Sequence, residues 1–156
     1  MYESSSMKKK YVIAIGADHR GFEHKQFLMQ HSYAHVDIIW IDVGAFSQER
    51  SDYPEFALAA VKPLLEKKVD YAVLLCATGV GMAIVANRFP GIFAGVAWNA
   101  EIAASAKEDD KVNIIVIPSG CVTHEEAVHI FSAWLSAEFK HGRYEERIAM
   151  IDAINV

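Results

Sequence analysis

The sequence lacks the features that mark secreted, membrane-spanning and nucleic-acid-binding proteins. Cysteine occurs twice in 156 residues, at Cys76 and Cys121, which is too few for a disulfide framework. Residues 1–10 contain no apolar signal core, and no run of about 18 apolar residues follows. The net charge of −5 disfavours a nucleic-acid surface or a polybasic membrane anchor. We therefore expect a cytoplasmic protein with no nucleic-acid or membrane partner.

Internal repeats, low-complexity tracts and linkers are also absent, and the chain has only four prolines. The composition, 53% hydrophobic and 22% charged, is typical of an ordered globular protein. At this length one domain can bury a substantial core. We expect a disordered N-terminal extension over residues 1–9 and a single domain over residues 10–156.

Short apolar runs alternate with helical patterns along the chain. The runs that we interpret as strands cover residues 11–16, 36–42, 71–76, 92–97 and 113–117. Most are continuous rather than alternating, which predicts burial on both faces and a parallel sheet. Helical patterns cover residues 20–31, 54–67, 80–88, 99–108, 124–139 and 143–154. This order predicts an α/β fold, a three-layer α/β/α sandwich with a five-stranded parallel, Rossmann-like sheet.

Local signals place several helix ends. Pro54 is typical of a first helical position, while Pro63 should bend or shorten the same helix. Thr123 and Glu126 form a capping box that precedes an apolar stripe. The last two helices carry more apolar surface than this sheet should cover, which favours a dimer. The alternative is a C-terminal helix folded back on the chain's own sheet.

The first candidate site is the turn after the first strand, residues 16–21 (GADHRG). It has no Gly-Lys-Ser/Thr sequence, so it is not a nucleotide P-loop. Its Asp18 carboxylate can bind sugar hydroxyls, and His19 can hold a phosphate or move a proton. Alternatively, Asp18 simply caps the following helix.

The second candidate site follows the third strand, at residues 76–82 (CATGVGM). Backbone N–H groups and the helix dipole at this position favour the thiolate form of Cys76. The same N–H groups can stabilise an oxyanion, so the turn suits proton abstraction beside a carbonyl. Residues 79–84 miss the last small residue of a dinucleotide fingerprint, which disfavours NAD. A buried cysteine that enters a tight turn is the alternative.

The third candidate site lies near the C-terminus. Arg143 and Arg147 are four residues apart, so on a helix they share a face that could bind a phosphate dianion. The alternative is a solvated helix in which Glu145 and Glu146 pair with the arginines.

Taken together, these motifs resemble the ribose-5-phosphate isomerase B family, which includes the subunits of galactose-6-phosphate isomerase. The resemblance extends from about Val12 to Asp152. Its landmarks are G-x-D-H-x-G-F at residues 16–22, S-D-Y-P at 51–54, C-x-T-G-x-G with A-N-R at 76–88, and G-R-x-x-x-R at 142–147.

The resemblance implies an aldose–ketose isomerase that works through a cis-enediolate without metal or redox cofactor. Cys76 would move the proton, and Thr78 with the backbone of Ala77, Gly79, Val80 and Gly81 would steady the enediolate. Asp18 and Tyr53 would contact the sugar, while His19, Arg143 and Arg147 would bind phosphate. A homodimer, or a tetramer, would share the site, with a C-terminal helical arm reaching across.

Three departures from the family pattern fall in this predicted site. The family's ring-opening histidine and the asparagine after it are replaced by Asp109 and Asp110, so we expect Asp109 to exchange the proton and Asp110 to line the sugar site. The arginine after the fifth strand is Gly120, whose missing charge Lys107 or Lys111 could replace. Ala77 stands where glycine is usual, which costs roughly 1 kcal/mol if φ is positive.

These departures leave alternatives to an active isomerase of ribose 5-phosphate. A catalytically weakened sugar-phosphate-binding protein, or one subunit of a galactose-6-phosphate isomerase, also fits the missing histidine. A phosphoacceptor signalling domain needs an aspartate at the position of Cys76 and is disfavoured.

Overall fold

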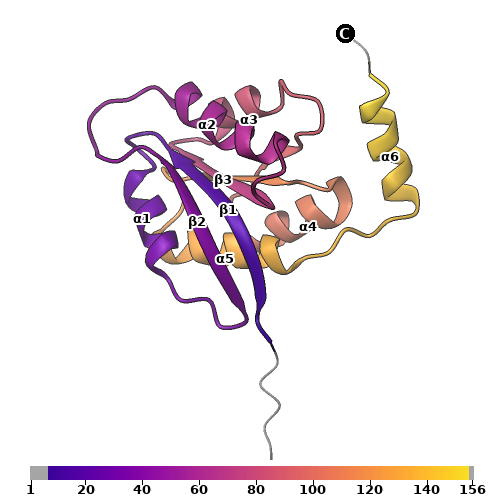
Figure 1. Ribbon diagram of the computed structural model, residues 1–156, viewed down its shortest axis with the longest axis horizontal. Helices are drawn as coiled ribbons and strands as arrows, with labels where there is room; N and C mark the ends of the chain where they lie inside the picture. Colours follow the sequence, from indigo (N-terminus) through magenta and orange to yellow (C-terminus); the bar gives the residue numbers. More distant parts are fainter. Residues whose placement is uncertain (1–6, 155–156) are drawn as a thin grey trace, which may run out of the picture.

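Five parallel strands form the centre of the molecule, in the order β2–β1–β3–β5–β4 (Figure 1). The structure is a computed structural model that describes residues 7–154; residues 1–6 of the predicted extension lie outside the described residues. The strands are β1 (Lys9–Ala17), β2 (Val36–Gly44), β3 (Tyr71–Cys76), β4 (Ala94–Val96) and β5 (Ile114–Pro118). The predicted parallel Rossmann-like sheet is therefore confirmed.

Helices cover both faces of the sheet. They are α1 (Phe22–Gln30), α2 (Tyr53–Leu65), α3 (Val80–Ala86), α4 (Ala100–Asp110), α5 (His124–Ser136) and α6 (Arg143–Asp152). One apolar core joins α1, α4 and α5 to the sheet, and a second joins α2 and α3 to its other face. The three-layer sandwich is confirmed, with two separate cores because the central strands β1, β3 and β5 are buried on both faces.

The helix boundaries follow the local signals. The Thr123 side chain accepts from the Glu126 N–H and the Glu126 side chain from the Thr123 N–H, so the predicted capping box is confirmed. Pro63 lies inside α2, which ends two residues later at Leu65 and is shorter than predicted. The α5 stripe is buried in the chain's own core rather than left for a partner.

Both edge strands depart from the expected pattern of continuous burial. In β2, which pairs only with β1, Ile39 and Ile41 are 60% and 42% exposed. In β4 the regular strand covers three residues instead of the predicted six, because only β5 flanks it. An apolar run does not distinguish a central strand from an edge strand, since burial depends on what lies beside it.

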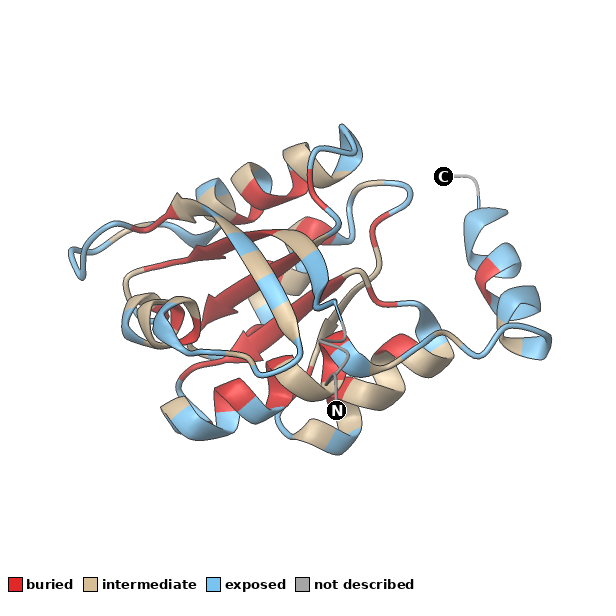
Figure 2. Cartoon of the chain, turned by 60° about the horizontal axis from the view of Figure 1, so that its bottom comes forward, coloured by how far each residue is buried: buried red, intermediate tan, exposed pale blue. Residues whose placement is uncertain are grey.

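Helix α6 forms an arm that stands away from the sandwich. Figure 1 shows it beyond α4, its main contact within the chain, at the end of an extended linker. In Figure 2 the arrowheads of the central strands point away from α6, most of which is exposed. The arm therefore does not fold back on the chain's own sheet. Its apolar side chains Met150, Ile151 and Ile154 remain exposed.

Within residues 7–154, no helix has the length and apolar character that crossing a bilayer requires.

Candidate active site

Two turns meet at the carboxyl edge of the sheet, where β1 and β3 end side by side. Ala17 pairs with Leu75 in the β1–β3 ladder, and the Asp18 N–H donates to the Leu75 carbonyl at 3.2 Å. Asp18 therefore lies next to the residue that precedes Cys76. Gly21 is needed here because a Cβ at this position would lie 2.7 Å from the Leu75 carbonyl oxygen. The structure brings the first two predicted sites together.

The Asp18 carboxylate holds the first turn in shape. Its Oδ1 accepts from the N–H groups of Arg20, at 3.0 Å, and Gly21, at 3.1 Å. The residue is buried, with 6% of its surface exposed. This geometry supports the capping role for one carboxylate oxygen. Oδ2 accepts no hydrogen bond from residues 7–154 and remains available to a ligand.

His19 is oriented by a loop from β2. Its ring Nδ1 accepts from the Ser51 backbone N–H at 3.2 Å, and the His19 backbone N–H donates to Ser51 Oγ at 3.0 Å. A neutral imidazole that accepts at Nδ1 carries its proton on Nε2. The ring therefore presents Nε2–H as a donor, which suits a phosphate or sugar oxygen.

Cys76 ends β3 and is almost enclosed. It is 5% exposed and packs with Leu74, Met82 and Val116, while its Sγ accepts from the Gly79 N–H at 3.2 Å. The hydrogen bond places the positive end of an N–H dipole directly at the sulfur. The structure thus combines the two alternatives considered for Cys76, because the residue is buried and also lies in a turn with N–H donors.

The N–H groups of the Cys76 turn have different uses. The Gly79 N–H donates to the Cys76 sulfur, and the Val80 N–H donates to Thr78 Oγ1 at 3.3 Å. Those of Ala77, Thr78 and Gly81 donate to no other residue among 7–154. Gly79 has φ of 77°, a left-handed conformation that glycine adopts without strain. The turn thus offers three N–H groups to an oxyanion rather than five.

Tyr53 forms a wall of the same site. It begins α2, one residue ahead of Pro54, and its side chain lies against Gly81. A Cβ at Gly81 would lie 2.5 Å from the Tyr53 Cζ, so a side chain here would displace the ring. Tyr53 is 39% exposed and faces solvent beside the Cys76 turn. The structure brings this predicted sugar contact to the site.

Two of the departures have simple structural explanations. Ala77 is not among the residues with positive φ, so its replacement of glycine causes no strain. The Gly120 N–H donates to the Ala77 carbonyl at 2.9 Å, and a Cβ at Gly120 would lie 2.9 Å from that oxygen. This close contact leaves no room for a side chain, so an arginine here would require the backbone to move.

Asp109 and Asp110 lie at the other edge of the sheet. They end α4 just before β5, whose last residue, Pro118, pairs with Cys76. Because the five residues of β5 span roughly 13 Å, the two aspartates and Cys76 of one chain are far apart. Asp109 Oδ1 accepts from Lys140 Nζ at 3.0 Å, which raises the pKa of the lysine.

The two arginines of the arm share one face, as the spacing predicts. Their guanidinium carbons lie 5.0 and 5.5 Å from the Tyr144 ring centre, for Arg143 and Arg147 respectively. The Arg143–Tyr144 hydrogen bond at 3.1 Å lowers the pKa of the phenol. Within residues 7–154, Glu145 pairs with His141 instead of an arginine. The arm thus presents two neighbouring guanidinium groups and stands away from Cys76 of its own chain.

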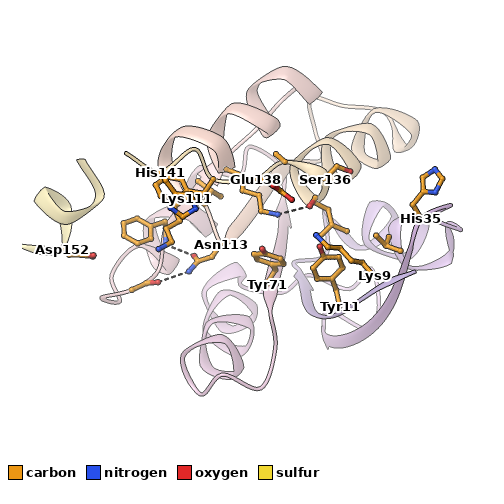
Figure 3. A pocket seen from close by; sticks show the side chains of 18 of the residues that line it. Lys9, Tyr11, His35, Tyr71, Lys111, Asn113, Ser136, Glu138, His141 and Asp152 are labelled. Atoms are coloured by element: carbon orange, nitrogen blue, oxygen red, sulfur yellow. Dashed lines mark hydrogen bonds between the residues drawn. The ribbon is translucent and has the colours of Figure 1, made fainter. Parts of the chain in front are cut away.

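A sizeable cavity lies away from these turns. It has a volume of about 950 Å³ and opens between the amino ends of the strands and the linker to the arm (Figure 3). Tyr11, Tyr71 and Asn113 line it, but none of the predicted site residues does. Lys107, one of the lysines that line it, donates to the Leu135 carbonyl at 3.0 Å and is 7% exposed. Lys107 is therefore hydrogen-bonded to α5, at the edge of the sheet opposite Cys76, and does not replace the missing arginine.

Sequence reasoning missed two contributors to the carboxyl edge. Ser51 lies in the S-D-Y-P landmark, yet its bonds to His19 depend on a fold that brings residues 32 positions apart together. Lys25 is wholly buried on the inward face of α1. The available signal was a lysine on the helix face that also carries Phe22 and Leu28.

Comparison with known proteins yields one consistent group. The family model for Ribose/Galactose Isomerase matches residues 13–151. Ribose-5-phosphate isomerase B of Escherichia coli K12 is 38% identical over 95% of this chain and 97% of its own.

Solved structures agree. A ribose 5-phosphate isomerase from Thermotoga maritima superposes with a TM-score of 0.86 at 36% identity, covering 92% of this chain and 99% of that one. Ribose-5-phosphate isomerase B from Mycoplasma genitalium with bound ribulose-5-phosphate gives 0.83 at 30% identity, covering 94% and 96%.

Proposed function

Because this chain belongs to the ribose/galactose isomerase family, we propose that it interconverts an aldose phosphate and its ketose isomer, with ribose 5-phosphate as the substrate. The observation that supports this most directly is the Cys76 thiol in a donor-rich turn, directly beside the Asp18–His19 turn. The relatives named as ribose-5-phosphate isomerases cover nearly the whole chain, which supports sugar-phosphate isomerisation as the reaction class.

In the proposed mechanism Cys76 is the general base. Its thiolate removes the proton from C2 of the aldose, and the electron pair moves onto the C1 carbonyl oxygen to give a cis-enediolate. The same sulfur returns the proton to C1, while the C2 hydroxyl passes its proton to the C1 oxygen and becomes the ketone, so no atom or electron is gained or lost. Each N–H that donates to the enediolate oxygen contributes about 3 kcal/mol. Among residues 7–154, the N–H groups of Ala77, Thr78 and Gly81 have no other acceptor.

The neighbouring residues bind and orient the substrate. His19 Nε2–H donates to a phosphate oxygen, and the accessible Asp18 Oδ2 accepts from a sugar hydroxyl. Tyr53 closes the wall above Gly81. Binding at groups remote from C1 and C2 fixes the reacting carbons against the sulfur and lowers the entropic part of the barrier.

The arm completes the site of a second copy. Arg143, Arg147 and Asp109 lie on one exposed surface that does not reach Cys76 within the chain. In a homodimer with shared sites, this surface covers the partner's carboxyl edge and supplies phosphate-binding cations, with Asp109 as the ring-opening acid or base. The exposed apolar residues Met150, Ile151 and Ile154 would then become buried. The cytoplasmic location remains a prediction.

The test is an aldose-to-ketose assay on the full chain with ribose 5-phosphate and a panel of hexose 6-phosphates. We expect conversion of ribose 5-phosphate and, in D₂O, deuterium at C1 of the ketose that forms. Cys76→Ala should abolish both signals, whereas Cys121→Ala, at an exposed thiol, should retain them. If no sugar phosphate is converted, the proposal is wrong.

A second candidate is one subunit of a two-component isomerase. It is favoured by Asp109, which stands in place of the family histidine and is paired with Lys140. This candidate predicts negligible turnover of every sugar phosphate by the purified chain, and restored turnover when a related chain with the histidine is added.

A further inference from the structure

Lys25 is a buried cation to which the proposed mechanism gives no role. It lies in α1, is 0% exposed, and places its Nζ 2.6 Å from Asp42 Oδ1 and 2.6 Å from the Ala45 carbonyl. The rings of Phe22 and Phe46 lie over it, with centres 5.4 and 5.2 Å from Nζ. Burying an ammonium is costly unless it is paired, so these partners account for its position.

The contacts of Lys25 fix the point where the chain leaves β2. Asp42 Oδ1 also accepts from the Gly44 N–H at 2.9 Å, and the Ala45 N–H donates to the Ala17 carbonyl at 2.6 Å. Ala17 directly precedes Asp18. Lys25 therefore holds the first residue of loop 45–52 against the base of the Asp18–His19 turn.

The far end of loop 45–52 carries substrate-facing groups. Ser51 exchanges two hydrogen bonds with His19, and Tyr53 follows at the start of α2. Between its ends the loop is exposed, and Phe46 is 71% exposed. Buried or partly buried contacts hold the loop at its two ends, one at Lys25 and one at His19, and an exposed hydrogen bond of 2.6 Å from Gln48 Nε2 to Glu23 Oε1 joins its middle to α1.

We propose that Lys25, through its ion pair with Asp42, is a positioning residue that holds loop 45–52 so that Ser51 orients the His19 ring. Lys25 itself touches no substrate. The effect of this role on catalysis rests on the proposed isomerase function. The orientation of His19 does not, because it can be measured without turnover. The ligand whose binding it controls is the phosphate of the sugar substrate.

The test variant is Lys25→Met/Asp42→Asn. It removes both charges together, so no unpaired charge stays buried, and the substituted amide keeps an oxygen for the Gly44 N–H. The matched control is Lys107→Met, which removes an almost equally buried lysine whose acceptor, the Leu135 carbonyl, lies at the opposite edge.

The first readout is the pair of imidazole ¹⁵N signals of His19. In the wild type we expect the Nδ1 signal of a nitrogen that accepts a hydrogen bond, from the Ser51 N–H. In the Lys25→Met/Asp42→Asn variant these signals should move to the tautomer mixture of a solvent-exposed histidine, while Lys107→Met leaves them unchanged. Unchanged His19 signals in the folded double variant would overturn the proposal.

The second readout is kinetic and uses ribose 5-phosphate. We expect KM to rise about tenfold with kcat changed less than about threefold, because substrate binding and not the base is affected. Added to His19→Asn, the double variant should cause little further loss, since both act through one ring. Fully additive losses would contradict the proposal.

Two outcomes remain distinguishable. If the wild type converts no sugar phosphate, the proposed function fails, yet the His19 signals still decide the positioning role. If the double variant does not fold, Asp42→Asn alone replaces it, since the Asp42 side chain is 22% exposed and the substitution keeps its shape. That variant should shift the His19 signals in the same direction to a smaller extent, and no shift would refute the role of the ion pair.

Discussion

The carboxyl edge of the sheet and the C-terminal arm carry different halves of the proposed active site. At the carboxyl edge, Asp18, His19 and Cys76 are at least partly buried and held by hydrogen bonds to residues elsewhere in the fold. On the arm, Arg143 and Arg147 are exposed, and both guanidinium groups lie against the ring of Tyr144 on the same helix. Preorganised groups suit proton transfer, whereas exposed surface cations acquire a fixed geometry only against a partner.

The sharpest test of this contrast is Cys76→Ala. We expect kcat to fall by roughly 10³-fold, because a positioned general base contributes on that order. Steady-state assays with ribose 5-phosphate measure the change, and thermal unfolding checks that the fold survives. A residual rate above about a tenth of wild type would mean that another group is the base.

The arm predicts a smaller effect with a distinctive pattern. Arg147→Ala should raise KM about 10- to 100-fold, through loss of a charge-assisted phosphate contact. If sites are shared, refolding an equal mixture of Cys76→Ala and Arg147→Ala chains should restore up to about a quarter of wild-type activity, because half the dimers then contain one intact site. Mixtures no more active than their components would place both halves in one chain.

The amino edge offers a prediction about pH and stability. Burial lowers the pKa of Lys107 to about 8 from 10.5, so between these values the unfolded chain binds the extra proton and the folded chain does not. The free energy of unfolding should therefore gain a contribution that rises with pH across this window and is lost as pH falls through 8.

Urea titrations of the wild type and Lys107→Met at several pH values isolate that contribution. Burial also raises the pKa of Tyr33 and Tyr71, which opposes the trend at the alkaline end. Because Lys107 Nζ lies 4.4 Å from the Tyr71 ring centre, the two proteins are compared below about pH 10, before tyrosines titrate. We expect the difference between the two curves to change only as the lysine titrates. A constant difference would show that Lys107 is equally protonated in both states.

The smallest effect should come from the surface pair at the arm. Lys140 lies 3.0 Å from Asp109 and 3.6 Å from Glu108, with almost half of its side chain exposed. Such pairs contribute little and are screened by salt. Lys140→Ala should leave thermal unfolding unchanged at high salt and shift it barely at low salt. A large shift at both would mean that the arm is fixed to its own chain.

Much of the fold could be read from local patterns. The predicted strand over residues 71–76 forms β3 without change, because a continuous apolar run bounded by a charged residue and a glycine turn fits little else. The edge strands were less predictable. Ile39 is exposed only because no strand or helix covers its side of β2, and nothing within the run indicates this.

The candidate site was predictable in its residues but not in its arrangement. The Cys76 turn could be placed at the carboxyl edge because parallel strands present their ends together. Which of its N–H groups are free for a ligand could not be predicted, since the Gly79 N–H donates to the Cys76 sulfur only in this backbone conformation. The replacement at Gly120 gained its explanation only from the 2.9 Å approach to Ala77.

Local sequence was enough to establish the succession of strands and helices, the parallel sheet and the identity of the groups proposed to surround a sugar phosphate. These follow from hydrophobic period, glycine and proline positions, and side-chain chemistry, which act over a few residues. Three features required the folded chain: Ser51 orients His19, Lys25 is buried beneath loop 45–52, and the arm lies away from Cys76 of its own chain. Such contacts join distant residues, and their energies depend on burial and geometry that no local pattern records.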